Sequence, residues 1–127
     1  MNEQSREVRL TIPASMDYAP VATLALSGLG MIAGLEVDVL GDLRTVAAEA
    51  LDCLLHQAGR PQCVEICASV ENGMLRVQFC ARQRTRVQET DELDLDITRG
   101  VLETLMPQVA LEADEDGVHG IRCAMPV

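Results

Sequence analysis

Two runs of alternating apolar and polar residues, separated by an Asn-Gly pair, constrain the fold of this chain more than any other feature. Apolar side chains recur at every second position over 64–70 and again over 75–81, which is the period of a half-buried strand. Asn72-Gly73 lies between the two runs, and this pair favours a two-residue hairpin turn because both residues tolerate positive φ. The sequence therefore predicts an antiparallel hairpin with one face on the core.

Three segments have helical spacing of their apolar residues. Residues 38–58 give the clearest pattern, since apolar positions three and four apart form one face of a helix. A second helix is predicted over 20–33, where Gly34 provides a stop, and a third over 94–106. Four residues of the third helix are expected to point inward: Ile97, Val101, Leu102 and Leu105.

The remaining segments complete the fold. Residues 7–13 alternate like a strand that ends at a proline, and 108–113 and 118–126 form a closing hairpin around the acidic turn 114–117. Residues 82–92 are polar and charged and without periodicity, so we expect a mobile connection there. The order strand, helix, helix, hairpin, helix, hairpin predicts an α+β two-layer sandwich: a mixed, mostly antiparallel sheet with three helices on one face.

Composition excludes several classes of function. A length of 127 residues suits one domain, 1–127, and 20 acidic against 10 basic residues give a net charge of −10, which repels nucleic-acid phosphates. All the basic residues are Arg, so lysine chemistry is absent. No apolar stretch is long enough to cross a membrane and the polar N-terminus lacks a signal peptide, so we expect a cytoplasmic protein.

The five cysteines are interpreted as reduced thiols that act mainly as small core residues. Cys63 and Cys67 lie four apart in a predicted strand, about 13 Å along it, which is too far for a disulfide. The sequence leaves open whether the odd number of cysteines has a redox role.

Five segments, in order along nearly the whole chain, carry a family resemblance: VRLTIPA at 8–14, DY at 17–18, LALSGL at 24–29, DLRTVAAEA at 42–50, and VLETLM at 101–106. Together they resemble the bacterial anti-sigma-factor serine/threonine kinases of the GHKL (histidine-kinase-like) ATPase superfamily. The resemblance implies the GHKL, or Bergerat-like, ATPase fold. It further implies ATP and Mg²⁺ as cofactors, and sigma factors, anti-anti-sigma proteins of the STAS type or a second copy as partners.

In that family one helix carries Glu and, four residues later, an Asn that holds Mg²⁺. Here Glu49 occupies the Glu position and would be the catalytic residue, but Cys53 occupies the Asn position. A thiol is a poor ligand for Mg²⁺. The family's neighbouring His falls on Gln57, with His56 one position away.

The other two nucleotide boxes also depart from the family pattern. The Asp that accepts from adenine falls on Ala81, and Arg82-Gln83 follow where the family has glycine. The second glycine box is replaced by Asp96 and Thr98. Carboxylates near that box would repel a triphosphate: Asp91, Glu92, Asp94 and Asp96. We therefore expect Cys53, Ala81, Asp96 and Thr98 to mark a degenerate nucleotide site.

Partner binding is expected on the first helix. The family's sigma-contacting Arg falls on Thr23, and the predicted partner-binding residues are Thr23, Leu24, Ser27 and Met31. Leu24, Leu26, Leu29 and Met31 are expected to form its apolar surface.

Several residues have alternative interpretations. Glu49, Asp52, Cys53 and His56 share a helix face and could ligate zinc, but nothing else in the sequence completes a site, so no metal is expected. Glu49 is interpreted as a packing residue or a partner of Arg44 or Arg60 rather than a general base. Five others are interpreted as structural or exposed positions: Tyr18 as a packing residue, His119 as a solvent-facing turn residue, and Arg82, Arg84 and Arg86 as a solvated edge that pairs with the acidic run 89–96.

The leading prediction is an anti-sigma-factor-like regulator of bacterial transcription that acts by protein–protein binding, without ATP binding or kinase activity. The alternative is an active serine/threonine kinase that uses Glu49 to phosphorylate a STAS partner.

Overall fold

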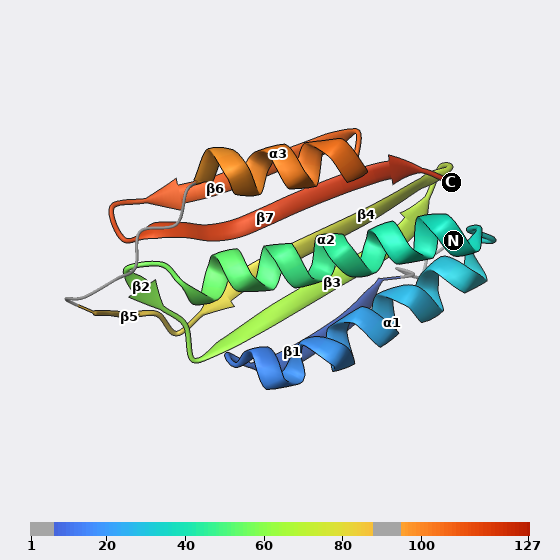
Figure 1. Ribbon diagram of the computed structural model, residues 1–127. Coiled ribbons are helices and arrows are strands. Elements are labelled where there is room, and N and C mark those ends of the chain that lie inside the picture. Colours follow the sequence, from blue (N-terminus) through green and yellow to red (C-terminus); the bar gives the residue numbers. More distant parts are fainter. Residues whose placement is uncertain (1–6, 88–94) are drawn as a thin grey trace, which may run out of the picture.

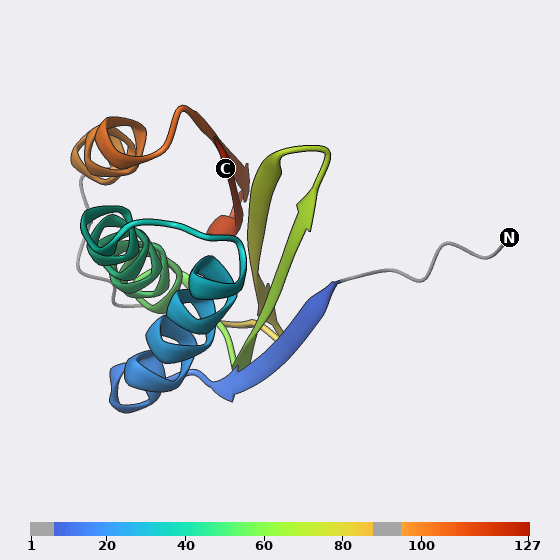
Figure 2. The same cartoon turned by 90° about the vertical axis from the view of Figure 1, so that its right-hand side faces the viewer.

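The structure, a computed structural model, describes residues 7–87 and 95–127, with only the backbone described at 95 and 96. Three helices cover one face of an antiparallel sheet, and the other face of that sheet is open (Figures 1 and 2). The helices are α1 (Ala19–Ile32), preceded by the 3-10 turn η1 (Met16–Tyr18), α2 (Val37–Leu55) and α3 (Leu95–Leu105). The predicted α+β two-layer sandwich is confirmed.

The main sheet has the strand order β1-β3-β4-β7-β6. Its strands are β1 (Val8–Pro13), β3 (Cys63–Glu71), β4 (Met74–Arg82), β6 (Gln108–Asp114) and β7 (Gly117–Pro126). Every pairing in the described residues is antiparallel. The predicted sheet was mostly antiparallel but mixed, and the mixed part of that prediction is wrong. A second, two-stranded sheet joins β2 (Gly59–Arg60) to β5 (Thr85–Arg86).

Local chemistry explains the predicted turns. Asn72 and Gly73 both have positive φ, 52° and 73°, as a type I′ hairpin turn requires. Gly34, at φ +81°, ends α1: its N–H reaches the carbonyl of Met31 at 3.1 Å, and Leu35 N–H reaches that of Gly30 at 3.0 Å. This pair of bonds is a Schellman motif, which satisfies two otherwise unpaired helix carbonyls.

The core lies between the helices and the sheet. Alternate residues of β3 and β4 point into it, and α2 packs between α1 and α3. Its largest fully buried side chains are Phe79, Leu43, Leu51, Leu54, Leu75, Leu102, Met106 and Ile121. Aliphatic residues therefore form nearly all of it, as the composition predicted.

Four predictions about local structure are wrong. Helix α2 ends at Leu55 rather than at 58, because Gln57 folds back onto it. Ile97 is 64% exposed: it lies about 100° around the helix from its buried neighbour Thr98. Within the predicted mobile connection, β5 forms a strand that pairs with β2, and 88–92 lie outside the described residues. His119 lies within β7, half-buried, and not in the turn.

Candidate functional site

Two nucleotide-box positions, Glu49 and Cys53, lie on α2. Glu49 is half-buried, and Cys53, one turn later, is 1% exposed. Burial, with the nearby charges of Glu49 and Asp52, raises the pKa of the Cys53 thiol to about 11. The thiol is therefore neutral at physiological pH, and a neutral thiol is a weak ligand.

Glu49 does not pair with either predicted arginine. Arg44 Nε instead donates to Ser27 Oγ at 3.2 Å, and an Arg60 guanidinium nitrogen donates to the carbonyl of Leu55 at 2.6 Å. Within the described ranges Glu49 forms no ion pair, so no arginine side chain is held beside Cys53. A packing role remains the simplest interpretation of Glu49.

His56 and Asp52 interact with each other at the end of the same helix. His56 Nδ1 lies 3.2 Å from Asp52 Oδ1 and 2.7 Å from the backbone oxygen of Asp52. Among the residues whose side chains are described, no three His, Cys, Asp or Glu side chains gather as a metal site requires. A zinc site on this face therefore has no geometric support.

Gln57 joins the end of α2 to the sheet. Its Nε2 donates to the carbonyl of Cys53 at 2.8 Å, and its Oε1 accepts from the backbone N–H of Val118 at 2.9 Å. The side chain is 7% exposed and lies against Gly117, where an added Cβ would overlap Gln57 Oε1. Gln57, at the position of the family's His, therefore links the end of α2 to β7.

The remaining box positions are apolar or buried. Ala81 is 8% exposed and pairs with Val64, so its methyl group offers no acceptor to an adenine amino group. Gln83 has a φ of 54°, so the chain keeps a left-handed turn where the family has glycine, although this costs a non-glycine residue about 1 kcal/mol. Thr98 is 5% exposed in α3.

The acidic residues of the second nucleotide box lie mostly outside the described residues. Asp96 lies in α3, but its side chain is not described, and Asp91, Glu92 and Asp94 lie outside the described residues. The expectation that carboxylates repel a triphosphate there stays a prediction.

The chain that follows β4 is fastened to the β6–β7 turn by arginines. Arg84 makes two parallel bonds to Asp114, at 2.7 and 2.9 Å, and Arg86 contacts Asp116 at 2.9 Å. Arg82 pairs instead with Glu65, at 3.1 Å. Arg82 and Arg86 are exposed, as predicted, but the Arg84 side chain is only 17% exposed. The described partners of the three arginines are Glu65, Asp114 and Asp116, and the predicted contact with 89–96 falls on residues whose side chains lie outside the description.

The Arg84–Asp114 ion pair should make the stability of the fold depend on pH. Arg84, with the backbone N–H of Asp116, holds the pKa of the Asp114 carboxyl well below its ordinary value of 3.8. A carboxyl whose pKa is lower in the folded state stabilises the fold above its unfolded pKa, and the stabilisation is lost as the pH falls below it. We expect Arg84→Gln to lower the urea midpoint at pH 7, and the difference from wild type to shrink between pH 4 and pH 2. A constant difference over this range would contradict the assignment, and Arg99→Gln, at an exposed position of α3, serves as the charge-matched control.

Helix α1 carries an exposed apolar surface. No charged residue occurs among its 14 residues, although 24% of the chain is charged. One side packs on the core, while a row on the other side is exposed, and we call this row the α1 stripe. The α1 stripe consists of Val21 (46% exposed), Leu24 (65%), Met31 (68%) and Ile32 (85%).

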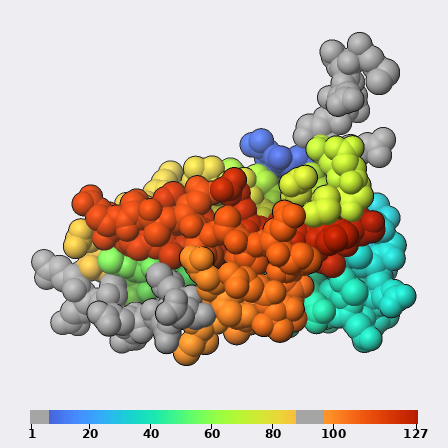
Figure 3. Space-filling model, turned by 90° about the horizontal axis from the view of Figure 1, so that it is seen from above, coloured from blue at the N-terminus to red at the C-terminus, as the bar shows by residue number. Residues whose placement is uncertain are grey.

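Two further exposed apolar residues flank the helix, one at each end. The turn between α1 and α2, coloured blue-green, projects at one end of the molecule (Figure 3) and leads to Val37, which is 81% exposed. Tyr18, at the other end of α1, is 45% exposed, so it does not pack as predicted. Exposed apolar side chains gathered on one side of a helix, as in the α1 stripe, are typical of protein interaction sites.

The predicted partner-binding residues divide between surface and interior. Leu24 and Met31 belong to the α1 stripe and Thr23 is half-buried, but Ser27 is 6% exposed. Ser27 donates to the carbonyl of Thr23 at 2.8 Å and accepts from Arg44. Leu26 belongs to the core and Leu29 is half-buried, so of the expected apolar surface only Leu24 and Met31 are exposed. The sequence analysis did not single out Val21, Ile32 or Val37. The helical spacing of Val21 and Ile32 with Leu24 could have indicated those two, whereas Val37 belongs to the next helix.

Comparisons with known proteins support the fold. A search of solved structures finds a crystal structure of the RsbU and RsbW domains of Rv1364c from Mycobacterium tuberculosis, with a TM-score of 0.69 and 12% identity. The match covers 96% of this chain and 32% of that chain. No protein-family model and no curated protein matches the sequence. At this identity the likeness confirms the expected fold and goes no further.

Membrane insertion by a helix finds no support. None of the helices in the described part of the chain is long and apolar enough to cross a bilayer.

Proposed function

We propose that this chain is an anti-sigma-factor-like regulator of bacterial transcription that works in the cytoplasm by protein–protein binding and needs neither ATP nor Mg²⁺. The observation that carries the proposal is the α1 stripe, an apolar surface on a helix without charges. The resemblance to anti-sigma-factor kinases places partner binding on this helix. The fold match to a chain that contains an RsbW domain is in line with that resemblance.

The α2 positions support the part of the proposal that concerns nucleotide. Cys53 is a buried, neutral thiol where the family holds Mg²⁺, and Ala81 offers no acceptor where the family holds adenine. Glu49 alone keeps the family residue. A general base without a bound substrate has nothing to deprotonate, so the proposal assigns Glu49 no catalytic step.

The partners that the proposal expects are a sigma factor, a STAS-type anti-anti-sigma protein or a second copy of this chain. The test is a pairwise binding panel of the sigma factors and STAS proteins from the same genome, with the chain itself included. We expect at least one partner to bind, with an affinity that is unchanged by Mg-ATP and by Glu49→Ala. Phosphorylation of a STAS protein that Glu49→Ala abolishes would establish the kinase instead, and a panel without any binding partner would contradict the proposal.

A further inference from the structure

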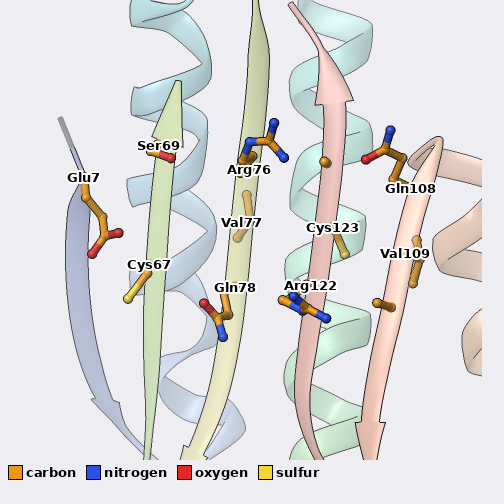
Figure 4. Close-up of a pocket in the computed structure, with 12 residues that line it drawn as sticks. Glu7, Cys67, Ser69, Arg76, Val77, Gln78, Gln108, Val109, Arg122 and Cys123 are labelled. Carbon is orange, nitrogen blue, oxygen red and sulfur yellow. The ribbon is translucent and has the colours of Figure 1, made fainter. Parts of the chain in front are cut away.

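The open face of the sheet, opposite the helices, has a hollow of about 460 Å³ that the proposed function does not use. Figure 4 shows its lining residues on neighbouring strands, with the side chains of Arg76 and Gln108 directed toward each other across β7. A volume of this size lies in the range of small-molecule sites.

The strand register explains why the sheet is hollow at this point. Ala124 of β7 pairs with Arg76 on one side and with Gln108 on the other. In the next row, Arg122 of β7 pairs with Gln78 and with Ala110. Paired residues share a face of the sheet, so two methyl groups form the floor and longer polar side chains form the walls.

The walls are rich in hydrogen-bond donors. The guanidinium groups of Arg76 and Arg122 and the amides of Gln78 and Gln108 line the hollow. Glu7, the one carboxylate among the described residues of the lining, is already paired with Arg9. A guanidinium offers five N–H donors and matches oxyanions in a bidentate geometry.

Arg76 differs from the other arginines of this face. Arg9, Arg82 and Arg122 each pair with a carboxylate: Glu7, Glu65 and Glu112. Arg76 forms neither an ion pair nor a hydrogen bond with any residue that the structure describes. The hollow therefore holds an uncompensated positive charge, although the chain as a whole carries −10.

We propose that this hollow binds a small molecule carrying an oxyanion, a carboxylate or a phosphate, which Arg76 holds with the amides of Gln78 and Gln108. The ligand contacts the sheet face opposite α1, so it can be bound together with a protein partner. Arg122, neutralised by Glu112, forms a wall of the site and adds little net charge.

The test is an NMR titration of the whole protein with inorganic phosphate and with citrate, against sodium chloride at equal ionic strength. We expect at least one of the two to give saturable shifts of the backbone amides of Ser69, Arg76, Gln78 and Ala124. Saturation by phosphate alone identifies a phosphate ligand, and saturation by citrate alone a carboxylate ligand. Shifts that match those of chloride would overturn the proposal.

Matched variants separate this site from bulk charge. Arg76→Gln is expected to weaken binding about tenfold or more, as the loss of a charge-assisted hydrogen bond should. Arg99→Gln makes the same change in net charge at another exposed arginine and should leave binding unchanged. Ala110→Leu fills the floor without a change in charge and is expected to abolish binding. Equal losses in Arg76→Gln and Arg99→Gln would show nonspecific ion attraction and overturn the assignment.

Discussion

Gly117→Ala is expected to lower the free energy of unfolding by about 3 kcal/mol, the sum of a strained backbone and an unpaired buried group. Gly117 has a φ of 99°, which L side chains rarely adopt. The added Cβ would also overlap Gln57 Oε1 and lie 3.1 Å from Gln57 Cβ. Displacing Gln57 breaks its bonds to Val118 and Cys53 and leaves buried groups without partners.

Urea denaturation monitored by circular dichroism measures this loss. Gly41→Ala is the matched control, since it lies inside α2 with no atom within 4 Å of an added Cβ, and it should stabilise the protein by about 0.5–1 kcal/mol. The double variant Gln57→Ala, Gly117→Ala should cost less than the sum of its single changes, because the first removes the atoms that clash. Strict additivity, or a Gly117→Ala variant as stable as Gly41→Ala, would contradict the contact.

Leu24→Asp with Met31→Asp is expected to weaken binding of the partner about a hundredfold or more. Buried anchors at the centre of an interface each contribute about 2 kcal/mol or more, and a carboxylate placed there would be desolvated without a partner. Both side chains project into solvent in the free protein, 65% and 68% exposed, so the double variant should keep its wild-type unfolding midpoint.

The control for this prediction is Ile97→Asp. Ile97 is 64% exposed, nearly the same as Leu24, but lies on α3. Surface plasmon resonance with the partner identified by the panel should show wild-type affinity for Ile97→Asp and a large loss for the α1 double variant. Equal effects of the two would place the interface elsewhere.

Local signals account for the part of the fold that the sequence predicted. The Asn72-Gly73 turn and the Gly34 helix stop depend on the φ preferences of neighbouring residues, so a short stretch of sequence suffices for each. The alternation of β3 and β4 also defines which residues enter the core. These features place the helices and the sheet correctly.

Contacts between distant residues could not be predicted in this way. Gln57 bonds to Val118 and Arg84 to Asp114, and neither pair has a local pattern. The early end of α2 depends on the first contact. The ordering of β5 against β2 accompanies the second, with the Arg84 side chain lying against Gly59. The burial of Ser27 likewise depends on Arg44, which lies on another helix.

The division of α1 into two faces also needed the structure. Both faces are apolar, so the helical period alone could not show that Leu26 is buried and Leu24 exposed. Packing against β1 and α2 buries the first and leaves the second in solvent. Burial of one face of α1 in the core is what defines the α1 stripe on the other face.

The central claim is that this fold acts through partner binding and without nucleotide, and calorimetric titration of the purified protein with Mg-ATP and Mg-ADP tests it most directly. An active anti-sigma-factor kinase, titrated in parallel, establishes that binding would be detected. The account predicts no heat beyond dilution for this chain. Saturable binding with a micromolar dissociation constant, reduced by Glu49→Ala, would contradict it.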